Sequence, residues 1–257
     1  MELTLEFMSR NNISVSILSC AIPLPVFAVL PALHDVPACI DEIRFAMHTL
    51  DADGVALFTS YDSKHLGHPD FEIKRAELNS LSAVVFIHPT MEGMENSIRE
   101  PFLIPRALID WPNETTRTAI HLIMTDTMRT FPTCKIILSH GGGALSYIAG
   151  RTSEIPIQTK LSGKSSEEIF EDAKKFWFDT ALMGDDDGPL ELLLGFAQAG
   201  HVLYGSDYPF VREPAVVKRA ITIDDIVDGD GKELPLVTRE NALKLFPRLK
   251  ARTKPFG

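Results

Sequence analysis

Cysteine is scarce in this chain, since only Cys20, Cys39 and Cys134 occur among its 257 residues. Their number is odd and their spacing matches no metal-binding pattern, so we interpret them as reduced thiols of an intracellular protein. None of the three has the surroundings of a catalytic nucleophile. The scarcity of cysteine therefore excludes a small fold held together by disulfides.

The sequence also lacks a basic cluster and a long apolar run. Its formal charge is -10, from 25 Lys and Arg against 35 Asp and Glu, which argues against nucleic acid as a partner. No apolar stretch approaches the roughly 20 residues that a membrane helix needs. The N-terminus lacks the charged and apolar regions of a signal peptide. We therefore expect a cytoplasmic protein with neither nucleic acid nor a membrane as its partner.

Apolar segments of strand length recur along the chain, and most of them are separated by helical patterns. This alternation predicts a parallel sheet covered by helices. The predicted strands lie at about 14–20, 26–31, 54–60, 83–87, 135–139, 176–180 and 202–205. With 45% hydrophobic residues, the chain can bury one large core, so a single domain over 1–257 is expected. The chain length and the alternation of strands and helices favour a (β/α)8 TIM barrel. A doubly wound sheet is less suitable, because no phosphate-binding loop comes after the first strand.

The helices are predicted from apolar periodicity and from capping residues. Ser165 and Glu168 form the pattern of a capping box, and Asn113 with Glu114 suits a helix start. The predicted helices cover 1–12, 36–50, 71–80, a segment after Asn113, the segment after Gly143, 165–175, 189–199 and 241–246.

Polar side chains come directly after three of the predicted strands. His88 ends the run AVVFI, His140 ends KIILS and precedes three glycines, and Asp207 stands just past VLYG. Catalytic groups of a (β/α)8 barrel collect at the carboxyl ends of different strands. Imidazoles and a carboxylate gathered there are suitable ligands for a divalent metal. Each histidine taken alone would be more typical of a hydrogen-bonded core residue, so the shared position carries the interpretation.

Five segments of the chain resemble one enzyme family. The segments are FIHPT at Phe86, FPTCKIILSHGGGALSYIAGR at Phe131, FWFDTAL at Phe176, VLYGSDYPF at Val202 and NALKLF at Asn241. Together they are similar to the decarboxylase branch of the amidohydrolase superfamily, which includes aminocarboxymuconate semialdehyde decarboxylase, γ-resorcylate decarboxylase and fungal 6-methylsalicylate decarboxylases. The stretch DADGVALFTSYDSKHLG resembles the 6-methylsalicylate type most.

The resemblance implies a (β/α)8 barrel with one catalytic divalent metal, with zinc as the first expectation and manganese as the alternative. His88 and Asp207 match metal ligands of the family, and His140 matches a histidine that acts near the metal as an acid or base. Arg151 matches an arginine that holds a substrate carboxylate, although a solvated arginine at a helix end is the competing interpretation. Phe210 would form an apolar wall beside the substrate ring.

The chemistry implied is the loss of carbon dioxide from a small aromatic carboxylic acid. A salicylate-like substrate would bind through its carboxylate and its neighbouring phenolate, and a proton delivered to the ring carbon would complete the exchange. Asp207 and His140 are both candidates for that delivery, and the sequence does not decide between them. A second copy of the chain, forming a homodimer, is a further expected partner.

One part of the family pattern is missing from this chain. Members begin with a strand that ends in H-x-H and supplies two metal ligands, whereas the helix predicted at 1–12 resembles the segment after that strand. The five residues Ala21–Pro25 are also too short to carry a parallel crossover. We therefore expect an incomplete, N-terminally truncated barrel that lacks its first strand and part of a later connection. His65 and His68 could replace the lost pair, but exposed loop histidines are the ordinary interpretation.

These patterns support three candidate functions. The first is a metal-dependent, non-oxidative decarboxylase of a hydroxybenzoate such as 6-methylsalicylate. The second is a metal-dependent hydrolase of a lactone or an amide. The third is an inactive, truncated paralogue without the H-x-H ligands. The remaining histidines are interpreted as structural or solvated: His34, His48, His121 and His201.

Overall fold

The structure is a computed structural model that describes residues 27–30, 33, 35–90, 98–183, 187–230 and 236–247. The helix predicted at 1–12, the strand predicted at 14–20 and the short connection 21–25 lie outside the described residues. His34 and Cys20 lie outside them as well.

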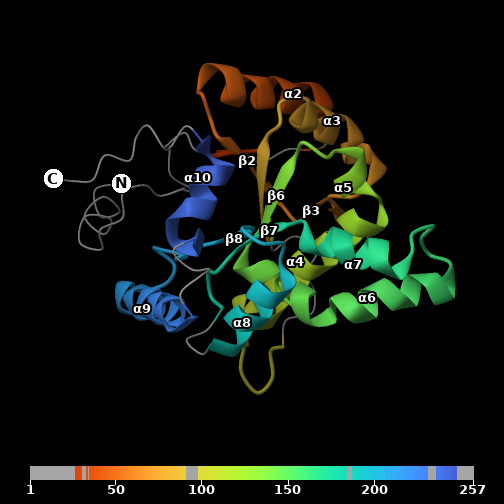
Figure 1. The fold of residues 1–257 in the computed structure, drawn as a ribbon. Coiled ribbons are helices and arrows are strands. Elements are labelled where there is room, and N and C mark those ends of the chain that lie inside the picture. The colour runs from red at the N-terminus through yellow and green to blue at the C-terminus, as the bar shows by residue number, and fades with distance from the viewer. Residues whose placement is uncertain are drawn as a thin grey trace.

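A parallel sheet of six strands forms the centre of the described fold (Figure 1). Its order is β1-β2-β5-β6-β7-β8, and every neighbouring pair is parallel. The strands are β1 Phe27–Val29, β2 Gly54–Phe58, β5 Val84–His88, β6 Lys135–Leu138, β7 Trp177–Asp179 and β8 Val202–Leu203. Each corresponds to a predicted strand, so the α/β class is confirmed. Within the described residues the sheet does not close on itself.

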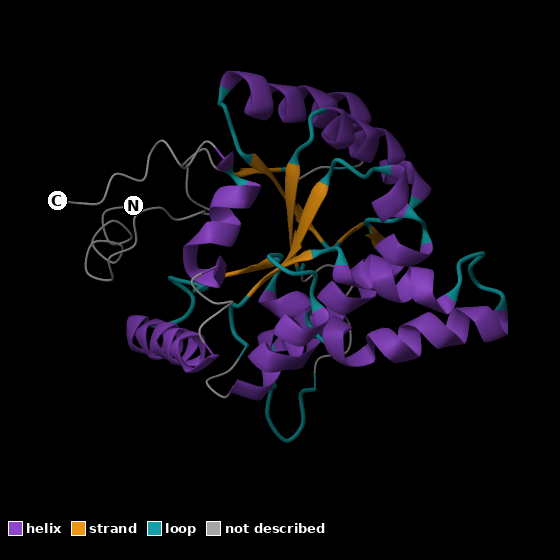
Figure 2. Cartoon of the chain, in the orientation of Figure 1, coloured by secondary structure: helices purple, strands orange, loops and turns teal. Residues whose placement is uncertain are grey.

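Helices surround the strands in the ribbon view (Figure 2). The α-helices are α2 Val36–Arg44, α3 Glu72–Ser80, α4 Arg106–Met124, α5 Thr127–Thr130, α6 Leu145–Thr159, α7 Ser166–Lys174, α8 Asp187–Phe196, α9 Glu213–Asp230 and α10 Asn241–Leu245. Shorter helical turns are η1 Phe45–Thr49, η2 Pro69–Phe71, η3 His140–Gly142 and η4 Leu236–Glu240. No helix in these described stretches combines the length and the apolar character needed to cross a bilayer.

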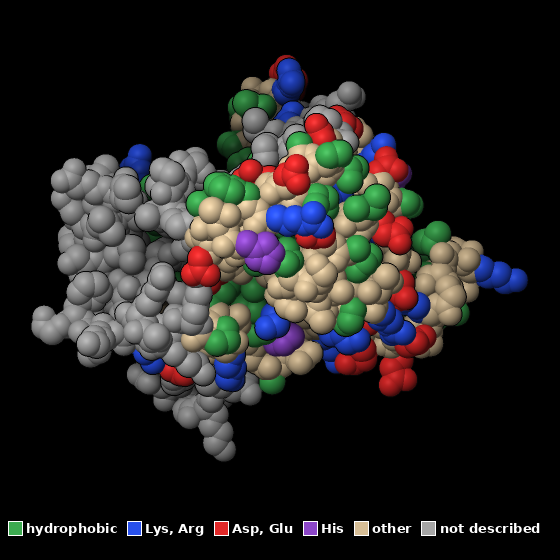
Figure 3. Space-filling model, turned by 90° about the horizontal axis from the view of Figure 1, so that it is seen from above, with side chains coloured by type: hydrophobic (Ala, Val, Ile, Leu, Met, Phe, Trp, Pro, Cys, Tyr) green, Lys and Arg blue, Asp and Glu red, His purple; other side chains and the backbone are tan. Residues whose placement is uncertain are grey.

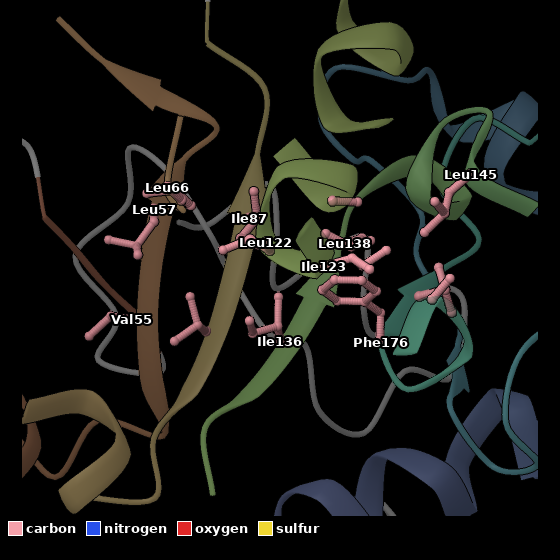
Figure 4. Close-up of a cluster of buried hydrophobic side chains, with 14 of the residues drawn as sticks. Val55, Leu57, Leu66, Ile87, Leu122, Ile123, Ile136, Leu138, Leu145 and Phe176 are labelled. Atoms are coloured by element: carbon pink, nitrogen blue, oxygen red, sulfur yellow. The ribbon is translucent and has the colours of Figure 1, made fainter. Parts of the chain in front are cut away.

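The outer face of the sheet packs against the helices. Alternate strand residues point to opposite faces, and Val55, Val85 and Ile136 belong to the larger apolar core, to which α4 adds Leu122 and Ile123. Figure 4 shows the side chains of this cluster between β2, β5, β6 and α4. This layer is the main source of hydrophobic stability, because it removes the apolar stripe of each helix from water.

The inner face of the sheet carries a second, smaller core. Its strand members alternate with those of the outer core and meet the C-terminal helix: Phe27, Ala56, Val84, Ile137, Trp177, Leu203, Leu243, Leu245 and Phe246. The ring of Phe246 meets that of Phe27 edge to face at 5.9 Å. Because Phe27 and Val84 begin their strands, α10 covers the amino end of this face. The carboxyl end of the same face remains for a site.

Some element boundaries differ from the predictions. The helix expected after Asn113 begins at Arg106 and contains Pro112, because seven further residues adopt helical geometry despite the proline that removes one backbone donor. The strand expected to reach Ser60 ends at Phe58, and a hairpin of β3 Ser60–Tyr61 and β4 Lys64–His65 comes next. The Tyr61 hydroxyl donates to the Leu30 carbonyl at 2.9 Å and so fixes this hairpin against the end of β1.

A buried carboxylate joins α5 to α7. The Asp172 side chain is fully buried and accepts hydrogen bonds from Arg129 Nε at 2.9 Å, Lys164 Nζ at 3.0 Å and Lys175 Nζ at 2.8 Å. The predicted capping box at the start of α7 is confirmed, since the Ser165 hydroxyl accepts from the Glu168 amide at 3.2 Å. Elsewhere on the described surface, acidic and basic side chains are interspersed (Figure 3).

Candidate active site

His88 stands at the carboxyl end of β5, on the inner face. It comes two residues after Phe86, and the two rings lie 6.4 Å apart. Its Nδ1 lies 3.0 Å from the Pro89 carbonyl oxygen and therefore donates to it. The neutral ring then keeps Nε2 as its unprotonated nitrogen. Burial lowers the pKa of His88, so the ring is neutral near pH 7 and can act as a ligand or a proton acceptor.

His140 meets His88 from the neighbouring strand, as the shared position at strand ends predicted. The two imidazole rings are edge to face, with centroids 5.3 Å apart. Burial, and then the neighbouring His88, lower the pKa of His140 to about 4. Its buried Nδ1 has no hydrogen-bond partner among the described residues. This neutral ring therefore keeps a polar nitrogen available for a ligand.

The glycines after His140 allow the turn to pack closely against α4. Gly143 has a φ of 66°, and a Cβ at this position would lie 2.0 Å from the Pro112 carbonyl oxygen. Only glycine fits both the backbone conformation and the available space. Thr116 closes the contact, because its hydroxyl accepts from the Ala144 amide at 2.8 Å and donates to the Pro112 carbonyl at 2.8 Å. The turn is therefore held on α4 by geometry that the sequence encodes locally.

Asp179 is a site residue that the sequence prediction missed. It ends β7 on the inner face, and its Oδ1 accepts from the His140 amide at 2.8 Å and from the Ala181 amide at 3.0 Å. Burial raises the pKa of Asp179 to about 7, and the negative charge of Asp207 adds to the rise. The signal was present in FWFDT, because a polar residue at a strand end is the feature that singled out His88 and His140.

Asp207 lies just after β8 with a φ of 56°, in the left-handed region. Burial raises the pKa of its carboxyl, and the positive charge of Arg219 opposes that rise. The negative charge of Asp207 also contributes to the raised pKa of Asp179, which ends the neighbouring strand β7. Asp207 therefore reaches the same end of the sheet as the predicted histidines.

Trp111 of α4 also borders His88. The indole and imidazole rings meet edge to face at 5.9 Å. The Nε1 atom of Trp111 is buried and has no hydrogen-bond partner in the described part of the chain. The region around His88 therefore offers an unused donor on Trp111 and an unused nitrogen on His140.

The other two predicted site residues are exposed on the surface. Arg151 is exposed on α6, and Phe210 is 78% exposed. Among the described residues, no hydrogen bond, ion pair or ring contact joins either of them to His88 or His140. Their roles as substrate contacts therefore stay predictions.

His65 and His68 have partners other than His88 in the described structure. His65 Nδ1 lies 2.9 Å from the Thr118 hydroxyl and 3.5 Å from Glu114, and its ring meets that of His121 at 5.9 Å. His68 accepts from the Asp70 amide through Nδ1. His65, in the hairpin, is thus bound to α4. His201, elsewhere in the chain, stacks on Trp177 with ring centroids 4.2 Å apart.

The metal expectation can be compared with the donors present. His88 and Asp207 provide an imidazole and a carboxylate, which are donor types that suit zinc or manganese. The described residues contain no group of three or more His, Cys, Asp or Glu side chains able to hold a metal. The donor chemistry therefore fits a divalent metal, whereas the ligand set within the described residues is incomplete.

Sequence comparison finds proteins that are similar to this chain over most of its length. Decarboxylase yanB of Aspergillus niger is 42% identical over 232 residues, which cover 86% of this chain and 62% of that protein. A 6-methylsalicylic acid decarboxylase of Penicillium expansum is 40% identical over 232 residues, covering 87% of this chain and 69% of that protein. The chain thus spans between 62% and 69% of the length of these two relatives.

Solved structures share the fold at lower identity. The crystal structure of an amidohydrolase II protein has a TM-score of 0.83 at 22% identity, covering 96% of this chain and 88% of that one. A 2,6-dihydroxybenzoate decarboxylase complexed with 2,6-dihydroxybenzoate has a TM-score of 0.78 at 19% identity, with coverage of 96% and 88%. These neighbours support the amidohydrolase-type TIM-barrel architecture, whose sheet is open in the described residues. The profile of the amidohydrolase family matches residues 11–248, and with the strand-end histidines in place, this chain belongs to the amidohydrolase family.

Proposed function

We propose that this chain is a non-oxidative decarboxylase that removes the carboxyl group of a small hydroxybenzoate, such as 6-methylsalicylate, as carbon dioxide. One observation carries the proposal: neutral His88 and His140 meet at the carboxyl end of adjacent strands in a chain 40% identical to a 6-methylsalicylic acid decarboxylase. The pair lies at the carboxyl end of the strands, which is the end where catalytic groups of TIM barrels lie.

The residues around His88 suit an aromatic acid in both shape and polarity. Trp111 offers an indole edge and an unpartnered N–H, which can donate to a carboxylate or phenolate oxygen. His140 Nδ1 offers a second polar contact. A ligand with two neighbouring oxygens, such as the carboxylate and phenolate of a hydroxybenzoate, could pair with both buried atoms.

The reaction exchanges one bond for another. The bond between the ring carbon and the carboxylate breaks, its electron pair stays on the ring, and a proton forms the new C–H bond as carbon dioxide leaves. His140 and Asp207 remain the two candidates for holding that proton beside the ring carbon.

Membership of the amidohydrolase family implies a divalent metal. His88 and Asp207 are the residues that we propose as its ligands, with zinc as the first expectation and manganese as the second. A bound metal would supply positive charge to fix the substrate carboxylate and phenolate. We also propose Arg151 and Phe210 as substrate contacts. A ligand bound at His88 would have to extend toward α6 to reach Arg151, or toward the turn after β8 to reach Phe210.

The experiment is a release assay for carbon dioxide with 6-methylsalicylate, with zinc or manganese added to the purified chain. Product appearing as 3-methylphenol in equal amount to the carbon dioxide would support the proposal. Hydrolysis of a lactone substrate without carbon dioxide release would instead favour the hydrolase function. Size-exclusion chromatography with light scattering on the same sample tests the predicted homodimer.

A further inference from the structure

The main chain of His140 adopts an uncommon conformation that needs support. Its φ is 56°, in the left-handed region that a β-carbon disfavours. The next three residues, all glycines, also have positive φ, so the turn has many accessible conformations when it is not held. A strained, glycine-rich backbone keeps one geometry only where surrounding groups determine it.

The carboxylate of Asp179 is the side-chain group that holds the amide of His140. Its Oδ1 accepts this N–H at 2.8 Å across the boundary between β6 and β7. The same oxygen accepts the Ala181 amide at 3.0 Å, which fixes the carboxylate to its own turn. The hydrogen bond to His140 therefore comes from a group that is itself held in place.

The main chain at Gly205 lies close to Asp179, and this position leaves little room for a side chain. A β-carbon on Gly205 would lie 3.0 Å from the Asp179 β-carbon and 3.1 Å from its carboxyl carbon. The Thr180 hydroxyl accepts from the Gly205 amide at 3.1 Å and holds that strand close. The carboxylate thus has little freedom to move away from His140.

We propose that Asp179 is a positioning residue, which fixes the His140 main chain and thereby aims the imidazole at the substrate beside His88. The proposal rests on the decarboxylase function for its kinetic readout only. Asp179 acts through an acceptor oxygen and needs no contact with substrate, so an uncharged acceptor of the same shape can replace it. This distinguishes positioning from proton delivery, in which the carboxyl itself would be required.

The test compares Asp179→Asn, which keeps an acceptor oxygen, with Asp179→Ala, which removes it. We expect Asp179→Ala to lower kcat about 100-fold with KM within about threefold, because a misplacement on the order of 1 Å has an effect of this size. Asp179→Asn should stay within about tenfold of the parent. Asn79→Ala is the matched control, since Asn79 Oδ1 accepts the Thr133 amide at 2.9 Å between α3 and the segment before β6.

A spectroscopic readout is independent of turnover. The protein is labelled with ¹⁵N-histidine, and the imidazole resonances of His140 are assigned by their absence in His140→Gln. These resonances should move or broaden in Asp179→Ala. They should stay near their parental positions in Asp179→Asn. Gly205→Ala is a second perturbation for the case in which Asp179→Ala does not fold. The added methyl group should displace the Asp179 carboxylate and produce the effects expected of Asp179→Ala. A chain without decarboxylase activity would contradict the proposed function, yet these resonances would still test the positioning.

Two results would overturn the inference. The first is an Asp179→Ala or Gly205→Ala protein, folded by circular dichroism, whose His140 resonances and kcat match those of the parent. The second is an Asp179→Asn protein that loses as much activity as Asp179→Ala while its His140 resonances stay parental. That pattern would assign Asp179 a role through its charge or its proton instead.

Discussion

The imidazole rings of His88 and His140 lie edge to face with centroids 5.3 Å apart, although they leave different strands of the sheet. Each ring removes water from the other, and burial with this proximity lowers the pKa of His140 to about 4. Both rings are therefore neutral at the pH at which most enzymes work. This pair is the centre of the proposed site, so it supplies the first prediction.

Replacing His140 by alanine should abolish decarboxylation and leave the fold intact. The ring contributes an unpartnered nitrogen to the site. The hydrogen bond from the main-chain N–H of His140 to Asp179 does not depend on the His140 side chain. Initial rates of carbon dioxide release and the far-UV circular dichroism spectrum are the measurements. His48→Ala, at an exposed histidine of η1, is the control and should keep full activity. Turnover retained in His140→Ala would remove this residue from the reaction.

Asp207→Asn should reduce the metal content of the chain as well as its activity. An amide is a poorer metal ligand than a carboxylate, and Asp207 is one of the two proposed ligands. Elemental analysis after loading with zinc and dialysis against metal-free buffer gives the metal per chain. Asp41→Asn, at an exposed position of α2, is the control. Unchanged metal content in Asp207→Asn would exclude it from the ligand set.

Trp111→Phe should raise KM for a hydroxybenzoate by about 10- to 150-fold, with a smaller effect on kcat. The phenyl ring keeps the contact with His88 and removes the buried N–H, and one hydrogen bond to a charged oxygen is worth about 1.5–3 kcal/mol. Steady-state kinetics with 6-methylsalicylate measures the change. Trp177→Phe removes an indole N–H from the ring that stacks on His201 and should leave KM unaltered. Equal KM values for the parent and Trp111→Phe would show that the indole donor does not bind the substrate.

Asp172→Ala should destabilise the fold by about 2–3 kcal/mol in urea unfolding, because it leaves three cations around a buried position without their shared partner. Lys164 is only 9% exposed, whereas Arg129 and Lys175 are 34% and 47% exposed, which moderates the loss. Glu171→Ala removes an exposed pair with Lys174 on the same helix and should change the unfolding free energy little.

The same carboxylate gives the fold a pH dependence with a defined sign. Burial raises the pKa of Asp172, but hydrogen bonds from Lys175 and Lys164 outweigh it, so the pKa lies below its ordinary value. A lowered pKa stabilises the fold above the unfolded pKa of about 3.9, and this stabilisation is lost as the pH falls through the folded value. The stability difference between the parent and Asp172→Ala should therefore shrink as the pH is lowered from about 6 to about 3. A difference that grows on acidification would contradict this assignment.

Gly143→Ala should destabilise the chain by about 2 kcal/mol or more and lower activity, since alanine is strained at a positive φ. The φ here is 66°, and the added Cβ would overlap the Pro112 carbonyl. Unfolding free energy and carbon dioxide release are measured together. Gly150→Ala is the matched control, because nothing lies within 4 Å of the added Cβ in α6, and it should stabilise the chain by up to about 1 kcal/mol. Parental stability in Gly143→Ala would show that the turn can move away from α4.

The strand-end rule predicted the position of His88 and His140 because their strands are short, continuously apolar and bounded by glycine or proline. Such runs identify a buried parallel strand without tertiary information. Asp179 was missed because the predicted strand runs to Thr180 and places this residue inside it, whereas β7 ends at Asp179 in the structure. Its importance comes from accepting the amide of His140, a contact across 39 residues of sequence that no local pattern encodes.

The predicted start of α4 is too late, because a proline normally marks a helix boundary. In the structure, Pro112 lies inside the helix and its carbonyl accepts from the Thr116 hydroxyl. The seven residues before Asn113 are therefore helical, and they include Trp111, whose ring contacts His88. The prediction placed these residues in a loop and did not indicate this contact. The hairpin that holds His65 was also missed, since its strands have only two residues each, below the length that periodicity can detect.

One helix carries two separable tasks in this chain. Thr116 anchors the glycine turn, while Trp111, on the preceding turn of α4, reaches the ring of His88. A laboratory evolution library could therefore vary position 111 broadly while keeping position 116 constant. Such a library would search new aromatic acids without sacrificing the scaffold that presents His140, which gives the chain an accessible route to altered substrate range.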